Sequence, residues 1–186
     1  MHRITRLFSI IALSAAFMAT GSGAVDAQTT MPSGEDSADM GRGMVEVSLM
    51  GGKVSIDYGR PEMKGRDMLA MAPDGFVWRF GSNKSTTFTT EADLMFGDQS
   101  LAKGSYSAWI KHVEGDSWSL IFNSEVGIWG APGASRENDV LEVPLTYSTG
   151  EESVERFTVE LKDSDGKGKL SASWGTHRLM GSFSAK

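Results

Sequence analysis

The chain has 186 residues, no cysteine and a formal net charge of −6. The lack of cysteine excludes disulfides and any site built on thiolates. The acidic balance, without a long basic stripe, argues against nucleic acid as a partner.

Residues 1–27 have the pattern of a secretory signal peptide. A short basic head precedes an apolar run at residues 7–18, and small residues follow up to a cleavage site at Ala27. The apolar run is too short to cross a bilayer as a permanent helix. We therefore expect a periplasmic or secreted protein, with no membrane insertion after signal cleavage. A lipid anchor is not expected, because no cysteine follows the cleavage site.

The rest of the chain divides into a leader and one domain. Residues 28–43 are polar, small and acidic and show no periodicity, which predicts a flexible leader. Residues 44–186 have the length of a single domain.

Within this domain the hydrophobic pattern has a period of two. Apolar residues alternate over 45–49 and again over 54–58 on either side of Gly51-Gly52, which predicts a β-hairpin. Further strands are expected at residues 76–80, 86–90, 94–96, 105–112, 117–123, 140–147, 154–162, 170–174 and 178–183. About ten short strands with regularly spaced turns predict an all-β fold, a single antiparallel, jelly-roll-like β-sandwich.

Two segments depart from this rhythm. Only residues 67–72 predict a helical turn in the domain. Pro144 lacks a backbone donor, so its strand is expected at an edge or with a bulge.

A positive segment stands out against the acidic background. Residues 60–84 hold five basic and three acidic side chains. The signal carries +1 and this segment +2, so −9 remains for the rest of the chain. A local positive excess in an acidic protein attracts anions.

This segment supplies the candidate ligand-binding residues. Pro61 favours an extended Arg60, and Gly65 allows a turn between Lys64 and Arg66. Arginine forks match carboxylates and phosphates, and amide groups add neutral hydrogen bonds. The candidate residues are Tyr58, Arg60, Lys64, Arg66, Arg79 and Asn83. The alternative is that the arginines pair with carboxylates of the domain itself.

The same residues carry a resemblance to a known family. Five motifs occur in order, at residues 58–66 (Tyr-x-Arg-Pro-x-x-Lys-Gly-Arg), 78–83 (Trp-Arg-x-Gly-x-Asn), 104–106 (Gly-x-Tyr), 118–123 (Trp-x-x-Ile-Phe-Asn) and 129–130 (Trp-Gly). The chain resembles, from Val45 to about Phe183, the exported bacterial family catalogued as domain of unknown function 2911. The resemblance implies a secreted, mostly β domain and no assigned activity.

Most catalytic and metal-site patterns are absent from the sequence. Outside the signal, His112 and His177 are the only histidines, and without cysteines or ligand spacing they do not predict a metal site. Residues 163–166 resemble the start of a calcium loop, but no glutamate closes it. No nucleophile elbow, Walker loop or dinucleotide motif occurs. We therefore expect no cofactor and identify no catalytic residue.

The tryptophans give expectations about burial. Trp118 and Trp174 share strand faces with apolar residues and are expected in the core. Trp109 is out of phase with its apolar neighbours, and Trp129 lies in a long loop, so these two are the candidates for exposed aromatic residues.

The sequence favours non-catalytic binding of an anionic small molecule or polymer in the cell envelope. One alternative is an envelope hydrolase or another enzyme that uses residues 60–83. The other is a structural or assembly protein without a small ligand. The oligomeric state and the identity of the ligand are not indicated.

Overall fold

The computed structural model describes the backbone of residues 29–32 and the whole of residues 41–186. Eleven strands and one short 3₁₀ turn, Arg136–Asn138, make up this part of the chain. The strands are β1 (Thr29–Pro32), β2 (Arg42–Leu49), β3 (Gly52–Gly59), β4 (Val77–Trp78), β5 (Thr86–Thr90), β6 (Leu94–Phe96), β7 (Gln99–Leu101), β8 (Gly104–Glu114), β9 (Ser117–Asn123), β10 (Asp139–Ser164) and β11 (Lys167–Ala185). The predicted signal peptide lies outside the described residues.

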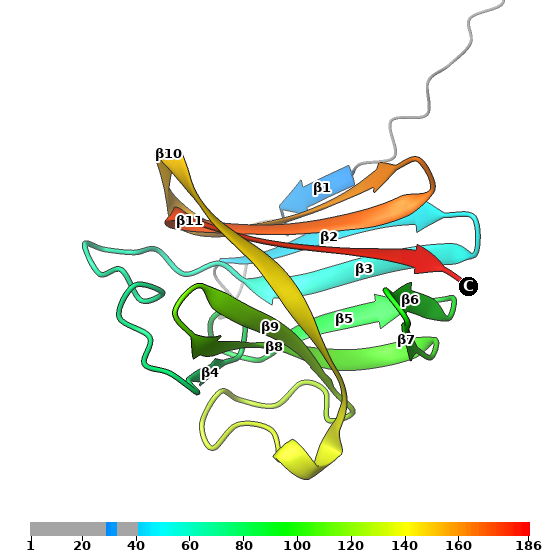
Figure 1. Cartoon of the computed structure of the whole chain (residues 1–186), viewed down its shortest axis with the longest axis horizontal. Helices are drawn as coiled ribbons and strands as arrows, with labels where there is room; N and C mark the ends of the chain where they lie inside the picture. The colour runs from blue at the N-terminus through cyan, green and yellow to red at the C-terminus, as the bar shows by residue number, and fades with distance from the viewer. Residues whose placement is uncertain (1–28, 33–40) are drawn as a thin grey trace, which may run out of the picture.

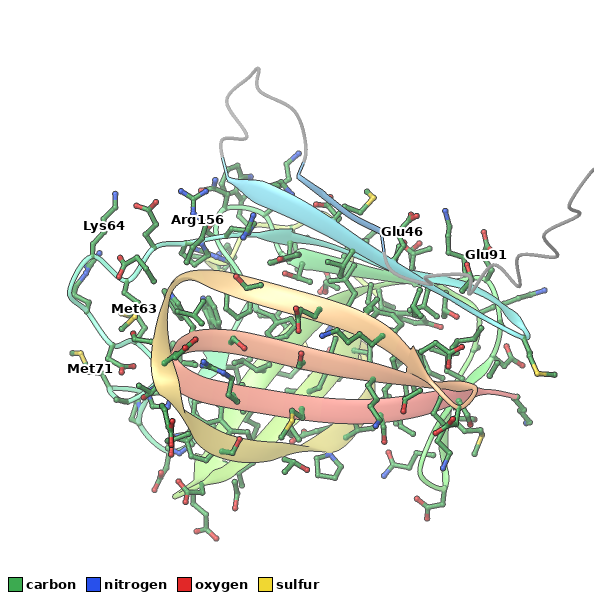
Figure 2. The ribbon with its side chains drawn as sticks, turned by 90° about the horizontal axis from the view of Figure 1, so that it is seen from above. Glu46, Met63, Lys64, Met71, Glu91 and Arg156 are labelled. Atoms are coloured by element: carbon green, nitrogen blue, oxygen red, sulfur yellow. The ribbon has the colours of Figure 1, made fainter. Side chains whose placement is uncertain are left out.

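The strands form one continuous antiparallel sheet, which confirms the all-β prediction. Its order is β1-β2-β3-β5-β8-β9-β10-β11-β6-β7, with β4 added beside β8. The β10–β11 hairpin crosses in front of β8 and β9, so the sheet has two layers (Figures 1 and 2). Among the described residues, no helix has the length and apolar character needed to cross a membrane.

The predicted hairpin at the start of the domain is confirmed. Strands β2 and β3 pair from Arg42↔Gly59 to Leu49↔Gly52. Their alternating apolar side chains, such as Val47 and Ile56, are almost fully buried. These residues join one core cluster with the aromatic side chains of β5, β9 and β11.

Four predicted strands near the C-terminus merge into the two long strands β10 and β11. The expected strands 140–147 and 154–162 leave residues 148–153 between them, but the strand continues through this stretch because bulges between Thr149 and Thr158 shift the register without ending the pairing. Gly175 adopts a left-handed conformation opposite these bulges. The hairpin therefore bends back on itself. As a result Gly168, near the hairpin tip, packs against Phe183 near the end of β11, where a Cβ on Gly168 would overlap the phenyl ring.

Residues 29–32 of the leader and Pro144 both lie in strands. Residues 29–32 pair with β2 as β1, and β2 begins at Arg42, two residues before the predicted start of the domain. The remaining leader residues up to 40 lie outside the described part. Pro144 lies in the first part of β10, which pairs only with β9, as expected of a residue without a backbone donor.

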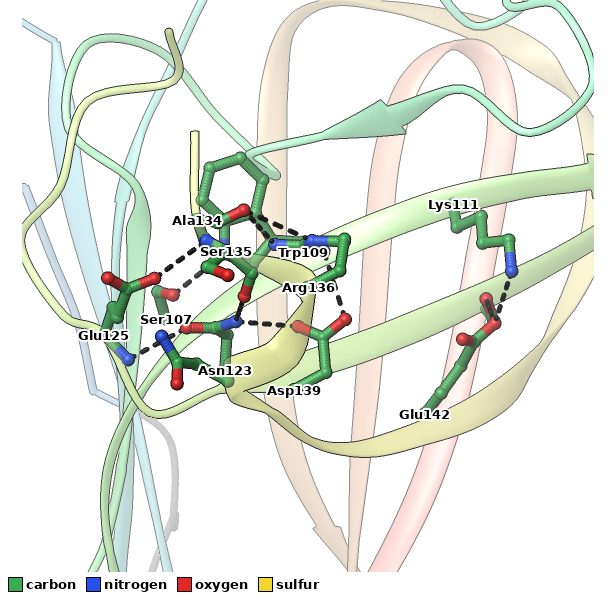
Figure 3. A network of polar contacts seen from close by, with 12 residues as sticks. Ser107, Trp109, Lys111, Asn123, Glu125, Ala134, Ser135, Arg136, Asp139 and Glu142 are labelled. Atoms are coloured by element: carbon green, nitrogen blue, oxygen red, sulfur yellow. Dashed lines mark hydrogen bonds and ion pairs between the residues drawn. The ribbon is translucent and has the colours of Figure 1, made fainter. Parts of the chain in front are cut away.

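The prediction that Trp109 is exposed is wrong, because the 124–138 loop covers the outer face of β8. Trp109 is 3% exposed; its Nε1 donates to Ser107 Oγ at 2.8 Å, and the Arg136 guanidinium lies 5.2 Å from its ring centre (Figure 3). The other three expectations hold, since Trp118 and Trp174 are buried and Trp129 is 59% exposed.

Candidate functional site

The positive segment runs from the end of β3 to the start of β5, and its first part docks on β10. The Met63 amide donates to the Glu155 carbonyl, and the Phe157 amide donates to the Pro61 carbonyl, both at 2.9 Å. Lys64 and Arg156 consequently lie at one end of the molecule (Figure 2). The loop is thus held by backbone pairing with the distal part of β10.

A close backbone contact joins the two halves of the segment. A Cβ on Gly59 would overlap the backbone of Ser82, and a Cβ on Gly81 would lie 2.9 Å from the Gly59 carbonyl oxygen. Only glycine allows this approach. Arg60 directly follows Gly59, and Arg79 lies two residues before Gly81. The contact therefore brings the backbone segments that carry the two arginines close together.

Arg60 is half-buried beside Tyr58 and the backbone of Gly43. A Cβ on Gly43 would lie 2.8 Å from Arg60 Cδ, so the glycine makes room for the arginine stem. Arg60 Nε is buried and has no hydrogen-bond partner, and no described carboxylate pairs with this side chain. Its charge is therefore uncompensated within the described residues.

Arg79 has the same character on the other side of the glycine contact. Its guanidinium lies on the backbone of Gly130, where any Cβ would overlap Nη1. Its Nε is also buried without a partner, and no ion pair is formed within residues 41–186. The guanidinium plane is thus fixed by packing rather than by a carboxylate.

The acidic residues nearest in the chain are bound to other arginines. Asp57 Oδ1 accepts from Arg42 Nε at 2.9 Å. Glu62 pairs with Arg156, whose hydrogen bond and charge hold the pKa of the Glu62 carboxyl below its usual value. The alternative in which Arg60 and Arg79 grip carboxylates of the domain is therefore not observed in the described part of the chain.

The other four candidate residues occupy different positions. Tyr58 is a core residue whose hydroxyl accepts from the Val159 amide at 3.0 Å, and burial raises its pKa. Lys64 and Arg66 are exposed in the turn beside Glu155, and no described contact joins their side chains to Arg60 or Arg79. Asn83 is exposed and left-handed, with φ 62°, directly after the glycine contact.

Trp129, which was expected to be exposed, lies beside the positive segment near Arg79, and the sequence pattern did not indicate this position. Trp129 forms an isolated β-bridge with Lys84, and its neighbour Gly130 supports Arg79. The Ser85 amide donates to the Ile128 carbonyl at 2.8 Å, which fixes this part of the loop. The long loop between β9 and β10 therefore places Trp129 beside the positive segment.

Buried polar bonds hold the far end of the same loop. Asn123 is fully buried; its Nδ2 donates to the Ser135 carbonyl and to Asp139 Oδ1, and its Oδ1 accepts from the Glu125 amide (Figure 3). Glu125 in turn accepts from the Ser135 amide at 2.8 Å. Every polar group of the Asn123 side chain thus has a partner, so the loop is rigidly anchored.

A chain of hydrogen bonds also links Asp67, His177 and Tyr147. His177 Nε2 lies 3.0 Å from Asp67 Oδ2, and its Nδ1 lies 2.7 Å from the Tyr147 hydroxyl. Burial raises the pKa of Asp67, but bonds from the Ala70 amide and His177 outweigh it and lower the pKa overall. The three residues lie far apart in the sequence, so no spacing could indicate them.

Neither histidine belongs to a metal-ligand cluster within the described residues. No group of three or more His, Cys, Asp or Glu side chains there is placed to hold a metal ion. His112 stacks on Trp118, with ring centres 4.5 Å apart, and both of its ring nitrogens face backbone carbonyl oxygens. Both histidines therefore have structural partners.

Comparison with characterised proteins and with solved structures gave no match. A family model does match, over residues 42–182, and its description is a protein of unknown function, DUF2911. The matched range begins with β2, includes both arginines and the Trp129 loop, and ends in β11. The chain therefore belongs to the DUF2911 family.

Proposed function

We propose that this protein binds an anionic small molecule or an anionic polymer of the cell envelope, without catalysis, at Arg60 and Arg79. One observation carries the proposal: both guanidinium groups lack a carboxylate partner in the described residues, and both hold a buried Nε without an acceptor.

The two uncompensated charges favour an anionic ligand. The Nε atoms are buried, so the ligand would be bound by the outer nitrogens of each guanidinium group. An anion on the outer nitrogens of each fork would compensate the charge and form bidentate bonds. Since Gly43 and Gly130 already fix the two side chains by packing, little rotamer entropy is lost on binding.

The exposed Trp129 extends this surface and suits a ligand with ring faces. Tryptophan offers a large, rigid contact area at low entropic cost. An anionic polysaccharide has both the carboxylates for the arginines and the sugar faces for the indole ring. The polymer form of the ligand is thus supported by the exposed ring next to Arg79.

Titration calorimetry with polygalacturonate and with inorganic phosphate tests this function. We expect saturable binding of at least one probe, which weakens with added salt because the charges are partly exposed. Arg60→Met and Arg79→Met should each weaken binding about tenfold. Arg156→Met is the matched control, since Arg156 already pairs with Glu62 and should leave binding unchanged. Unaltered binding in both variants would refute the proposal.

The enzyme alternative is favoured by the Asp67–His177–Tyr147 chain, in which a carboxylate orients a histidine towards a hydroxyl. This is the arrangement of an activated nucleophile or a general base. Hydrolysis of a nitrophenyl ester that is lost in Tyr147→Phe and in His177→Gln, with the fold intact, would establish it. The assembly alternative would use exposed aromatic residues as a contact surface for a partner. Of the two expected residues only Trp129 is exposed, because Trp109 is buried.

A further inference from the structure

We propose that a second site, distinct from the arginine surface, binds a fatty acid: a single acyl chain with a carboxylate at one end. The site is a cavity of about 720 Å³ between the two halves of the folded β10–β11 hairpin, next to the β6–β7 turn. This volume falls in the range of small-molecule sites, roughly 300–1,000 Å³.

The cavity exists because β10 changes partner partway along its length. It pairs with β9 up to Leu145 and with β11 only from Thr146, opposite Met180. Beyond this branch point the first part of β10 and the last part of β11 separate, and the hairpin tip folds back beside the opening. The space between them is therefore a product of the fold and not of one missing side chain.

The walls of the cavity are mainly apolar. The apolar side chains that line it are Phe96, Leu120, Val143, Pro144, Leu145, Leu170 and Met180. A Cβ on Gly181 would lie 3.1 Å from Leu145 Cδ2, so this glycine keeps the space beside Leu145 open. Polar side chains, among them Gln99, Thr146 and Ser182, make up the rest of the lining. The apolar walls are suited to a hydrocarbon chain.

Two lysines mark the polar end. Lys162 and Lys169 both line the cavity, both are exposed, and they stand directly opposite each other in the β10–β11 ladder. Like charges in this position destabilise a sheet. A carboxylate between them would remove the repulsion.

The acidic groups of this region leave one lysine uncompensated. Glu160 Oε2 lies 3.2 Å from Lys162 Nζ, so Lys162 has an acidic partner, although this exposed pair only partly offsets its repulsion from Lys169. Asp98 lines the cavity from the β6–β7 turn but forms no ion pair with either lysine. Lys169 has no acidic partner among residues 41–186, and it is the cation that we assign to the ligand carboxylate.

A fatty acid explains these features better than a peptide strand. An added strand requires backbone donors along the exposed edge, and Pro144 removes one in the middle of the β10 edge. An uncharged lipid would leave the lysine pair without a role. The combination of an apolar wall with an unpaired cation at the mouth fits an amphipathic anion.

Titration calorimetry with dodecanoate on the full chain, below its micellar concentration, tests the proposal. We expect one saturable site, weaker binding of dodecanol, which lacks the charge, and no measurable binding of butanoate, which lacks the chain. Lys169→Gln should weaken dodecanoate binding about tenfold and bring it close to that of dodecanol. Its melting temperature should be unchanged or raised, because one of two facing like charges is gone.

Matched variants separate this site from others. Lys103→Gln removes an exposed charge at the opposite end of the β6–β7 hairpin and should leave binding unchanged. Gly181→Leu should fill the space beside Leu145 and abolish binding while the β-sheet circular dichroism signal remains. The Arg60→Met, Arg79→Met double variant should bind dodecanoate normally, so that failure of the arginine site does not affect this result.

Three results would overturn the proposal. They are no saturable binding of dodecanoate, equal binding by wild type and Lys169→Gln, and equal binding of dodecanoate and butanoate. Saturable binding of an extended peptide that Gly181→Leu abolishes, without binding of dodecanoate, would assign the cavity to a peptide instead.

Discussion

Two regions of the molecule meet at Gly130: the loop between β9 and β10, and the positive segment after β3. They differ in whether their buried polar groups have hydrogen-bond partners. At the base of the loop, the side-chain amide nitrogen and oxygen of Asn123, the last residue of β9, are both hydrogen-bonded within the protein (Figure 3). In the positive segment, the buried Nε atoms of Arg60 and Arg79 have no hydrogen-bond acceptor among the described residues. The two neighbouring regions thus differ in whether their buried polar groups are satisfied within the described residues, and the proposed anion site concerns only the second region.

The largest expected effect comes from breaking the satisfied region. Asn123→Ala removes three hydrogen bonds from a fully buried side chain and takes their hydrogen-bond partner from the Glu125 amide and from Asp139 Oδ1. We expect a loss of about 2–4 kcal/mol in the free energy of unfolding, measured by urea denaturation. Ser124→Ala, which removes only one long bond to Asn138, should cost less than about 1 kcal/mol. Equal effects of the two substitutions would show that the network does not stabilise the loop.

A smaller effect, of opposite sign, is expected in the positive segment. Arg60→Met and Arg79→Met keep the packed stem but remove a buried donor without a partner, so stability should be unchanged or rise by up to about 1 kcal/mol. Arg42→Met is the contrast, because it breaks the bond to Asp57 and should cost about 1 kcal/mol or more. Thermal denaturation of the three variants in parallel measures the difference. A clear loss of stability in all three would mean that Arg60 and Arg79 are structural as well.

The smallest expected effect is on the pH dependence of the free energy of unfolding. It concerns a third site, His112, a partly buried group that has hydrogen-bond partners. Burial lowers the pKa of His112, but the carbonyl oxygens of Gly115, Pro73 and Ala72 and the charge of Asp74 outweigh it and raise the pKa above 6.5. Because the folded-state pKa is raised, the stabilisation is complete below the unfolded value and is lost as pH rises through the folded value.

The difference in unfolding free energy between wild type and His112→Gln should therefore shrink from about pH 5 to about pH 8. Urea denaturation at several pH values measures it. A difference that does not vary with pH would show that the imidazolium is not the species that bridges the two carbonyl oxygens. The contribution of Asp67, whose pKa is lowered, is present in both proteins and cancels in this comparison.

The sequence by itself determined the strands whose pattern is local. The β2–β3 hairpin and strands β5, β6 and β9 appear where alternation and turn residues predicted them, because a strand with one buried face repeats every second residue. The positive segment was also visible, since charge is counted directly along the chain. The resemblance to the family came from motifs that include Gly81 and Gly130, each of which allows a close backbone or side-chain approach.

Only the tertiary structure decided which surfaces are covered and which distant residues meet. Trp109 is out of phase with its strand, as an exposed residue would be, but a loop fifteen or more residues away in sequence buries it. Bulges joined four expected strands into β10 and β11, and the fold of that hairpin created the lysine-edged cavity. Asp67 meets His177 across 110 residues. Burial of an outer face, strand branching and long-range hydrogen bonds depend on packing between elements, which a pattern within one element does not contain.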